Sequence, residues 1–351
     1  KEALAEKDEA FMDLACRLAL RGRGHTKPNP MVGAVLVRRG KTFSTGYHRR
    51  PGTPHAEVIA IEDAKEGVAG ATLYVNLEPC AHQGRTPPCV DLILAKKIRR
   101  VVIGTKDTNP LVNGRSIASL RRKGVQVTCG VLEEKCRRLN ETFFKHVETN
   151  KPFVTLKAAL TLDGKIASSS GQSQWISCPA SRQKVHKLRS IVDAILVGIE
   201  TVLQDDPQLT VRGIRGAANP CRVVMDSRLR VPMTARVLER SAETLLATTD
   251  RAPKTKIRRL ESKGIQVEVF RPDRSGRVPL GRLLRLLGKR GMQHVLLEGG
   301  SGVYTTALKA GEVDKLLLFL APLLLGGKEA PSLFDGIGFP SPKKGLPVQD
   351  F

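Results

Sequence analysis

His55-Ala56-Glu57, followed downstream by Pro79-Cys80 and by Cys89, is the stretch from which the fold of this chain can be argued. One imidazole and two thiolates are three good zinc ligands, and three protein ligands leave a fourth coordination position open for water. Zinc lowers the pKa of such a water to near neutrality, so the water becomes a nucleophile. Glu57 lies just beyond His55, where a carboxylate can shuttle protons without binding the metal. We therefore expect a hydrolytic site with His55, Cys80 and Cys89 on zinc and Glu57 as the catalytic proton shuttle.

The spacing of the two cysteines is unusual. Zinc base deaminases follow the pattern His-x-Glu and then Pro-Cys-x-x-Cys, and they remove an amino group from a heteroaromatic ring. In this chain the longer segment 81–88 separates the two cysteines. The alternative interpretation is that Cys80 and Cys89 are buried small apolar side chains and that His55 is an ordinary polar residue. The residues occur in the order that the chemistry requires, which favours the zinc site.

The length and composition limit the possible classes of protein. A chain of 351 residues predicts two or three domains, each long enough to bury its own core. The hydrophobic fraction of 41% is ordinary for a soluble globular protein, and no apolar run approaches membrane-spanning length, so no membrane partner is expected. The scattered cysteines do not suggest a disulfide framework and favour a reducing compartment. We expect a cytoplasmic protein, or a plastid protein if a removed targeting segment preceded Lys1.

The net charge of +24 supports a competing interpretation. Strongly basic proteins often bind nucleic acid, so the zinc motif could belong to a nucleic-acid base deaminase with an unrelated second domain. The arginine pairs, however, are dispersed along the chain and form no basic tail. Aromatic residues make up only 4% of the chain, which leaves few stacking platforms for single-stranded bases. We expect a solvated basic surface, some of whose cations serve a phosphorylated small substrate, and no nucleic-acid partner.

Strands and helices alternate in the first part of the sequence, as in an α/β domain. Apolar residues at helical spacing, or in short runs between turn residues, predict the elements. The expected helices cover 9–21, 56–66, 89–95, 116–123 and 132–149, and the expected strands cover 31–37, 73–77, 100–104 and 125–128, with a hairpin turn at 38–41. His55 and Cys89 then lie at helix N-termini, where the dipole favours thiolate over thiol. Asn150-Lys151-Pro152 breaks the last helix and marks the domain boundary.

A second α/β pattern fills residues 151–351. Its strand candidates and intervening helices predict a mixed sheet, with strands at 153–158, 194–197, 222–225, 244–247, 266–270, 294–298 and 315–320. No Gly-x-Gly-x-x-Gly fingerprint follows a strand, so a dinucleotide-binding Rossmann unit is not supported. Residues 298–302, Glu-Gly-Gly-Ser-Gly, do follow a strand and lead into a helix at 303–308. Backbone at such glycines can approach a phosphate, and the helix N-terminus offers free N–H groups; the alternative is a plain loop.

Two further clusters in the second half suit a phosphorylated ligand. Residues 198–201, Gly-Ile-Glu-Thr, follow a strand, and the segment 205–212 comes soon after them. Trp175, the single tryptophan, lies in a loop rich in Ser, Gln and Gly, which favours a place beside a ligand over a place in the core. Arg189 and Arg212 are candidates for a substrate phosphate, because guanidinium matches phosphate oxygens bidentately; the alternative is that both are ordinary surface arginines.

Together the two halves resemble the RibD family of bifunctional riboflavin-biosynthesis deaminase/reductases. The likeness covers nearly the whole chain, and the long loop between the two cysteines is its most specific element. It rests on residues 29–33, 46–48, 55–57 and 77–89 in the first half, and on 161–165, 173–176, 205–207 and 298–300 in the second. The resemblance implies a cytidine-deaminase-like three-layer domain, residues 1–150, joined to a dihydrofolate-reductase-like mixed-sheet domain, residues 151–351.

The resemblance also implies two successive reactions and two cofactors. A diaminopyrimidinone that carries a phosphoribosylamino group, 2,5-diamino-6-(5-phosphoribosylamino)pyrimidin-4-one, loses its ring amine by zinc-dependent hydrolysis. The ribosyl group of the product, 5-amino-6-(5-phosphoribosylamino)uracil, is then reduced to ribityl with NADPH. Family analogy further implies a homo-oligomer, a dimer or larger.

Individual residues take roles by the same resemblance. His55, Cys80 and Cys89 would bind zinc, and Glu57 would move the proton. The residues implied to contact the deaminase substrate are Asn29, His48 and Arg85. Those implied to face the NADPH cofactor are Ala159, Trp175, Thr201, Asp205, Ser227, Gly300, Ser301, Gly302, Val303, Tyr304, Thr305 and Thr306. Those implied to face the sugar phosphate in the reductase are Ser173, Arg189, Leu209, Arg212 and Glu298.

The sequence departs from the family pattern in the first half. Residues 107–110 read Asp-Thr-Asn-Pro where the family usually has Asp-Pro-Asn-Pro, and a later glycine of the family is Ser116 here. Both positions lie outside the ligand set, so we expect an effect on loop conformation and none on the chemistry. A final strand of the reductase sheet would lie beyond Phe351. A third interpretation, a zinc-stabilised binding protein without catalysis, is disfavoured because Glu57 is present and the site has three ligands instead of four.

Overall fold

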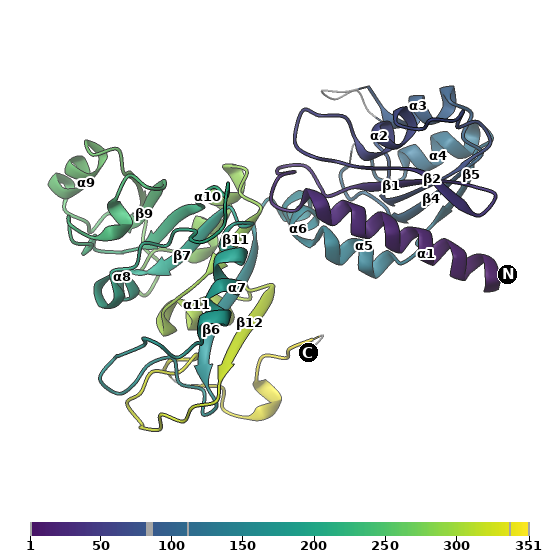
Figure 1. The fold of residues 1–351 in the computed structure, drawn as a ribbon. Helices are drawn as coiled ribbons and strands as arrows, with labels where there is room; N and C mark the ends of the chain where they lie inside the picture. Colours follow the sequence, from purple (N-terminus) through teal and green to yellow (C-terminus); the bar gives the residue numbers. More distant parts are fainter. Residues whose placement is uncertain (1, 82–86, 111, 337, 350–351) are drawn as a thin grey trace. The chain divides into compact units, whose positions relative to one another are not determined.

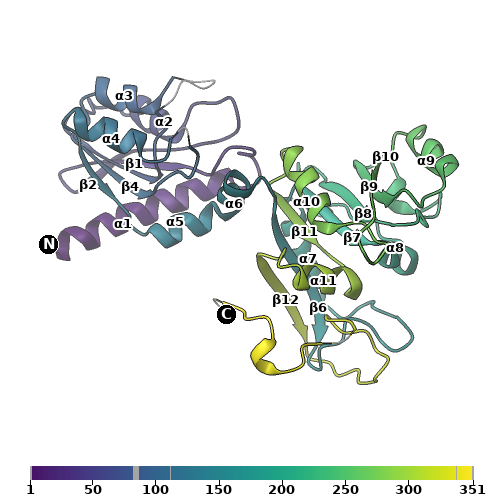
Figure 2. The same cartoon turned by 180° about the vertical axis from the view of Figure 1, so that it is seen from behind.

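In the computed structural model the chain divides into two compact units, Lys1–Asn150 and Lys151–Phe351. The structure describes residues 2–81, 87–110, 112–336 and 338–349. Figures 1 and 2 show the units from opposite sides. Among the described helices, none is both long and apolar enough to cross a lipid bilayer.

The first unit is built on a five-stranded sheet with the order β2-β1-β3-β4-β5. β1 (Gly33–Arg38) and β2 (Lys41–Tyr47) form the expected antiparallel hairpin, and β1 also pairs antiparallel with β3 (Thr72–Leu77). β3 runs parallel to β4 (Arg100–Thr105), and β4 runs parallel to β5 (Gln126–Cys129).

Helices cover both faces of this sheet, which gives three layers (Figure 1). Leu36 of β1 packs in the cluster beneath α2, α3 and α4, while the neighbouring Val35 packs in the cluster beneath α1 and α5. Successive strand residues point to opposite faces, so one strand serves both cores. The helices are α1 (Glu2–Ala19), α2 (Ala56–Glu62), α3 (Cys89–Ala95), α4 (Arg115–Arg122), α5 (Glu133–Leu139) and α6 (Glu141–Thr149), with a short 3-10 turn, η1, at Leu20–Gly22.

Two glycines let helices lie against the hairpin. A Cβ added at Gly33 would lie 2.1 Å from the carbonyl oxygen of Ala15 in α1, and one added at Gly46 would lie 2.3 Å from that of Ala56 in α2. Any larger residue would push the helix backbone away from the sheet. Gly46 therefore fixes the position of the α2 N-terminus, which carries His55 and Glu57.

The expected continuous helix 132–149 is wrong, because the chain leaves the helical conformation at Asn140. The side chain of Asn140 bonds instead to the backbone of Met31: Oδ1 accepts the N–H at 2.8 Å, and Nδ2 donates to the carbonyl oxygen at 2.9 Å. This contact with a distant loop competes with the helical pattern and divides the segment into α5 and α6.

The second unit is built on a seven-stranded sheet with the order β10-β9-β8-β7-β11-β6-β12. Its strands are β6 (Phe153–Thr161), β7 (Ala194–Gly198), β8 (Cys221–Met225), β9 (Thr244–Thr249), β10 (Gln266–Phe270), β11 (His294–Leu297) and β12 (Lys315–Ala321). Its helices are α7 (Pro179–Arg189), α8 (Ile199–Asp205), α9 (Lys254–Glu261), α10 (Leu280–Lys289) and α11 (Ser301–Lys309), with 3-10 turns η2 (Arg236–Leu238) and η3 (Pro342–Lys344). β7 is buried along its whole length, as expected for a central parallel strand.

The pairs between these seven strands are all parallel. The sheet was expected to be mixed; among the described residues, the antiparallel contact in this unit is confined to an isolated bridge between Lys165 and Ser332. Crossover connections, most of them containing a helix, return the chain to the same edge before each new strand begins. The carboxyl ends of the strands consequently lie along one edge, where α/β sheets bind their ligands.

Candidate active sites

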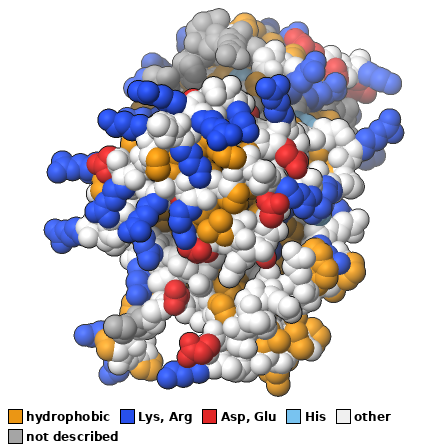
Figure 3. Space-filling view, turned by 90° about the vertical axis from the view of Figure 1, so that its left-hand side faces the viewer, with side chains coloured by type: hydrophobic (Ala, Val, Ile, Leu, Met, Phe, Trp, Pro, Cys, Tyr) orange, Lys and Arg blue, Asp and Glu red, His pale blue; other side chains and the backbone are white. Residues whose placement is uncertain are grey.

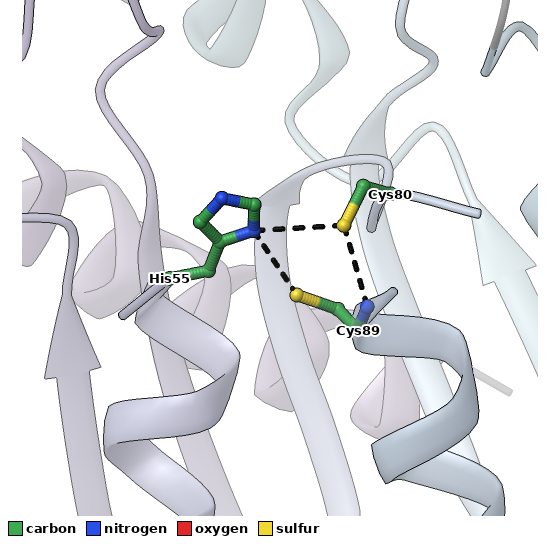
Figure 4. A group of neighbouring side chains, drawn as sticks. All are labelled: His55, Cys80 and Cys89. Atoms are coloured by element: carbon green, nitrogen blue, oxygen red, sulfur yellow. Dashed lines mark hydrogen bonds between the residues drawn. The ribbon is translucent and has the colours of Figure 1, made fainter. Parts of the chain in front are cut away.

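His55, Cys80 and Cys89 point toward one another in the first unit (Figure 4). Nδ1 of His55 lies 3.2 Å from Sγ of Cys89 and 3.5 Å from Sγ of Cys80, and the three ligand atoms all lie within 4.8 Å of one another. A tetrahedral zinc with bonds of about 2.1 Å to nitrogen and 2.3 Å to sulfur would separate these atoms by roughly 3.6 Å. The three side chains therefore fit a zinc ion with one coordination position left open.

Helix and strand ends hold the three side chains in place. His55 is the N-cap residue of α2, and Cys89 is the first residue of α3, as the sequence predicts. Cys80 follows the end of β3, and its Sγ accepts the backbone N–H of Cys89 at 3.3 Å. Hydrogen bonds from the Cys89 thiol, from His55 and from this N–H lower the pKa of Cys80 to about 4. These contacts favour the thiolate form of Cys80, which is the form that binds zinc.

Glu57 lies in the first turn of α2 and is only 3% exposed. Burial raises the pKa of its carboxyl group, and the nearby His55 opposes that shift. A carboxyl group in this setting accepts a proton more readily than an exposed one. The geometry thus suits a proton shuttle beside the metal ligands.

The carboxylate of Glu78 accepts hydrogen bonds from the loop that precedes α4 and from the first turn of that helix. The sequence did not predict this contact. The carboxylate oxygens accept the N–H groups of Asp107 at 3.3 Å, Gly114 at 2.9 Å and Ile117 at 3.4 Å, and also the hydroxyl of Ser116. The resemblance implies glycine in the family where this chain has Ser116, and the Ser116 hydroxyl bonds to Glu78, which stands two places before Cys80.

Two of the three predicted deaminase substrate residues lie together beside the metal group. Nδ2 of Asn29 lies 3.0 Å from Nε2 of His48. The ring of His48 stands edge-on to that of His55, with ring centroids 5.6 Å apart. Burial lowers the pKa of His48, which favours its neutral form. Arg85 lies outside the described residues.

The second unit holds a cleft of about 1210 Å³ along the carboxyl edge of its sheet. Pockets for small ligands usually measure about 300–1,000 Å³, so this cleft has room for a dinucleotide and a second molecule. Sixteen of the predicted reductase residues line it: Ala159, Ser173, Trp175, Arg189, Thr201, Asp205, Leu209, Arg212, Ser227, Glu298, Gly300, Ser301, Gly302, Val303, Tyr304 and Thr306. The glycines of residues 299–302 open α11, whose N-terminus lies in the cleft wall.

Thr305 is the exception, because it does not line the cleft. Its Oγ1 accepts the backbone N–H of Asp335 at 2.7 Å. Thr305 belongs to α11, where neighbouring residues point in different directions, so a continuous run of helical residues cannot all face one ligand. The sequence prediction for Thr305 is therefore not supported by the geometry.

Trp175 lies in the cleft wall and is 67% exposed, so it is not a core residue. The guanidinium carbon of Arg182 lies over the ring of Trp175, 4.4 Å from the ring centroid. The expectation that this tryptophan borders a ligand site instead of the core agrees with its position.

Lys157 is a cleft residue that the sequence reasoning missed, because it lies within the apolar run of β6. It is the one lysine among the described residues that line the cleft. Burial lowers its pKa, while the charge of Glu298 opposes that shift. A partly buried lysine of this kind can give up its proton more easily than an exposed one. Arg212 also lines the cleft, and its backbone N–H donates to Nδ1 of His186 at 3.2 Å.

Comparison with family descriptions divides the chain in the same way. Residues 5–105 match the cytidine and deoxycytidylate deaminase zinc-binding region, and residues 152–349 match the RibD C-terminal domain. The riboflavin biosynthesis protein RibD of Aquifex aeolicus is 43% identical over 347 residues, which cover 99% of this chain and 95% of that protein. The Escherichia coli protein of the same name is 40% identical over 91% of this chain and 89% of its own length.

Solved structures agree with this assignment. Acinetobacter baumannii RibD superimposes with a TM-score of 0.85 at 37% identity, over 98% of this chain and 94% of that one. The Thermotoga maritima diaminohydroxyphosphoribosylaminopyrimidine deaminase/5-amino-6-(5-phosphoribosylamino)uracil reductase gives a TM-score of 0.81 at 40% identity, over 94% and 90% of the two chains. The similarity thus spans both units.

Proposed function

Since the chain belongs to the RibD family of bifunctional riboflavin-biosynthesis enzymes, we propose that its two units catalyse successive steps on one substrate. The first unit removes the ring amine of 2,5-diamino-6-(5-phosphoribosylamino)pyrimidin-4-one. The second reduces the ribosyl group of 5-amino-6-(5-phosphoribosylamino)uracil to ribityl. One observation supports this most strongly: a three-ligand His/Cys/Cys group beside the buried Glu57 occurs in a chain whose other unit matches the family's reductase domain.

The alternative of a nucleic-acid deaminase with an unrelated second domain is wrong, because residues 152–349 match the RibD C-terminal domain. Lys and Arg side chains are spread over the face drawn in Figure 3, with Asp and Glu among them, and do not form one continuous stripe. We propose that the basic surface is mainly solvated and that the substrates are phosphorylated small molecules.

In the deaminase unit, His55, Cys80 and Cys89 would hold a zinc ion, which supplies a water that ionises near neutral pH. Glu57 would accept a proton from this attacking water and deliver it to the amine as the carbon–nitrogen bond breaks. The water oxygen becomes the ring carbonyl and the amine leaves as ammonia, so the step needs no oxidant. Asn29 and His48 lie where they can orient the pyrimidine ring.

In the reductase unit, the proposed cofactor is NADPH. Hydride would pass from the nicotinamide to C1 of the ribosyl group, and one proton would be taken up as the sugar ring opens. Lys157 lines the cleft and would provide that proton, and the charge of Glu298, which lines the same cleft, favours the protonated form of the lysine. The glycine-opened N-terminus of α11 lines the cleft and can bind the pyrophosphate, because the free backbone N–H groups at a helix N-terminus favour phosphate.

We also propose that the chain forms a homo-oligomer in the cytoplasm or in a plastid. β12 is an edge strand, and its Leu317, Leu318 and Leu320 are 36%, 39% and 64% exposed. An exposed apolar edge of this kind is usually covered in the working protein. The cysteines are all free, which is compatible with a reducing compartment. Light scattering after size exclusion tests the assembly, and a monomer at micromolar concentration would contradict it.

The proposed activities are tested by supplying the diaminopyrimidinone substrate with NADPH and following ammonia release and NADPH oxidation separately. Wild type should show both, and it should contain one zinc per chain. Cys80→Ser should lower the zinc content and ammonia release together, while the reduction of already deaminated substrate should continue. Equal zinc in wild type and Cys80→Ser would contradict the metal site, and a protein that holds zinc yet releases no ammonia would contradict the deaminase.

A further inference from the structure

The segment 210–212 borders the reductase cleft and belongs to no helix or strand, so its backbone polar groups need partners elsewhere. Three side chains supply such partners, one for each residue: Nη1 of Arg189 donates to the carbonyl oxygen of Thr210 at 3.1 Å, Oδ1 of Asn219 accepts the N–H of Val211 at 2.8 Å, and Nδ1 of His186 accepts the N–H of Arg212 at 3.2 Å. Of these three partners, the histidine is the one whose charge changes near neutral pH.

Arg212 is one of the residues implied to face the sugar phosphate, and it is exposed in the cleft wall. The other arginine of that set, Arg189, is held in a buried ion pair with Glu298. Binding of the phosphate therefore depends chiefly on Arg212. A guanidinium group binds phosphate oxygens in pairs, so its affinity depends on how its fork is oriented. The position of the backbone at residue 212 limits the orientations that the side chain can reach.

His186 lies on α7, three residues before Arg189, and lines the same cleft. A neutral imidazole has one ring nitrogen that donates a hydrogen bond and one that accepts. Because Nδ1 accepts the N–H of Arg212, the neutral ring carries its proton on Nε2. An imidazolium ion has two donors and no acceptor. Protonation of His186 would therefore break the bond to Arg212.

The surroundings of His186 favour the neutral ring. Burial is the largest cause that lowers the pKa of His186, and the charges of Arg189 and Arg212 lower it further. The charge of Glu298 and a backbone hydrogen bond with Thr210 oppose this shift without cancelling it. The ring is therefore neutral at pH 7, and its bond to the backbone of residue 212 is formed. That bond is lost only as the pH falls through the lowered pKa.

We propose that neutral His186 is a positioning residue of the reductase: its Nδ1 holds the backbone of Arg212 so that the guanidinium is oriented for the phosphate of the sugar substrate. This rests on the proposed function, in which 5-amino-6-(5-phosphoribosylamino)uracil is reduced in this cleft. In this role His186 transfers neither hydride nor proton. Its loss should therefore weaken the binding of the phosphorylated substrate and leave the rate of the bound complex unchanged.

The test replaces the imidazole in two ways. His186→Phe keeps a planar ring without an acceptor, and His186→Asn puts an amide oxygen near the position of Nδ1 without a titrating group. With deaminated substrate, His186→Phe should raise the KM for that substrate by about 2–10-fold, the usual effect of one hydrogen bond. The kcat and the KM for NADPH should stay at wild-type values. His186→Asn should remain close to wild type. Lys187→Ala, at an exposed position of α7 outside the cleft, is the matched control.

A double-mutant cycle shows whether His186 acts through Arg212. Arg212→Ala alone should raise the KM for the substrate by about 10–100-fold, because a hydrogen bond between charged groups is lost. Adding His186→Phe to Arg212→Ala should then change the KM little, since no guanidinium remains to be oriented. If the two effects instead multiply, His186 acts independently of Arg212, and the inference is overturned.

The pH dependence separates positioning from direct binding of the phosphate by a charged histidine. As the pH falls through the lowered pKa of His186, the KM of wild type should rise more than that of His186→Asn. The phosphate titrates alike in both proteins, so the ratio of the two KM values isolates the histidine. A ratio that falls on acidification would mean that the imidazolium binds the phosphate itself, and it would overturn the inference.

The same measurements keep this inference apart from the proposed function. Wild type that reduces the deaminated substrate, together with an unchanged KM in His186→Phe, would overturn the role of His186 and leave the reductase intact. A fall in kcat without a change in KM would also overturn it. Wild type that oxidises no NADPH with deaminated substrate would instead contradict the proposed reductase.

Discussion

Arg189 and Glu298 form a bidentate ion pair in the wall of the reductase cleft, with Nε 2.7 Å from Oε1 and Nη2 2.8 Å from Oε2. The two side chains are only 12% and 6% exposed, and Nη1 of Arg189 also donates to the carbonyl oxygen of Thr210 at 3.1 Å. The guanidinium expected to bind the sugar phosphate is thus engaged with protein. Arg212 is exposed and lines the same cleft, so it is better placed than Arg189 to bind the sugar phosphate.

Breaking this pair should destabilise the second unit. Arg189→Met leaves Glu298 buried without its partner, which typically costs about 3–5 kcal/mol of unfolding free energy. Arg230→Met is the matched control, because its exposed pair with Glu200 is worth about 0–1 kcal/mol. Urea unfolding of the full chain, followed by circular dichroism, measures both. If both variants lost a similarly small amount of unfolding free energy, the buried pair would contribute no more to stability than the exposed one.

The same variant should reverse the pH dependence of stability. In wild type, burial acts to raise the pKa of Glu298, but Arg189 and, more weakly, Lys157 and His186 hold it below its ordinary value of about 4.3. A lowered folded-state pKa contributes stability above that value, which is lost as the pH falls through the lowered pKa. Without Arg189 burial should dominate, so the pKa would be raised and stability would be lost as the pH rises above about 4.3. The free energy of unfolding is measured at several pH values between acid and neutral pH. The same dependence on pH in wild type and Arg189→Met would contradict this.

Lys157 should matter for reduction and not for deamination. Removing a group that delivers a proton usually costs about 10²–10⁴-fold in rate, so Lys157→Met should slow NADPH oxidation by that order. Ammonia release and binding of NADPH should stay at wild-type levels. Burial lowers the pKa of Lys157. As the pH rises, the rate of reduction by wild type should therefore begin to fall at a lower pH than it would if the proton donor were an exposed lysine. Unchanged NADPH oxidation by Lys157→Met would contradict the proposed proton donor.

Glu78 and Ser116 should affect how firmly zinc is held. Groups that orient a metal ligand typically change metal affinity by about 10–100-fold, so Glu78→Gln should speed transfer of zinc to a coloured chelator by roughly tenfold. Ser116→Gly, which removes the hydroxyl bond and restores the family residue, should have a smaller effect in the same direction. Arg122→Ala, on an exposed position of α4, is the control. If wild type and the three variants lost zinc to the chelator at the same rate, the hydrogen bonds of Glu78 would stabilise the loop without affecting how zinc is held.

Local patterns were sufficient to predict much of the fold. α3 and β10 occur at their expected bounds, because turn residues flank a clear apolar pattern in each. The zinc group could be predicted because its chemistry needs particular side chains in a particular order.

What could not be predicted depends on contacts between distant residues. Asn140 ends a helix because it bonds to Met31, 109 residues away, and Arg189 meets Glu298 across the same separation. Glu78 bonds to Ser116, 38 residues further on. Lys157 has no local signal, since only the folded sheet turns that strand residue toward the cleft. Such partners become visible only when the topology is known.

The central claim is that one chain carries two independent sites, and Glu57→Gln tests it most directly. The variant keeps the shape of the side chain but removes the base, so ammonia release should fall by about 10²–10⁴-fold or more while zinc stays bound. Supplied with already deaminated substrate, the same protein should oxidise NADPH at a rate close to that of wild type. If Glu57→Gln lost reduction of the deaminated substrate as well, with its zinc and fold intact, the two sites would not be independent.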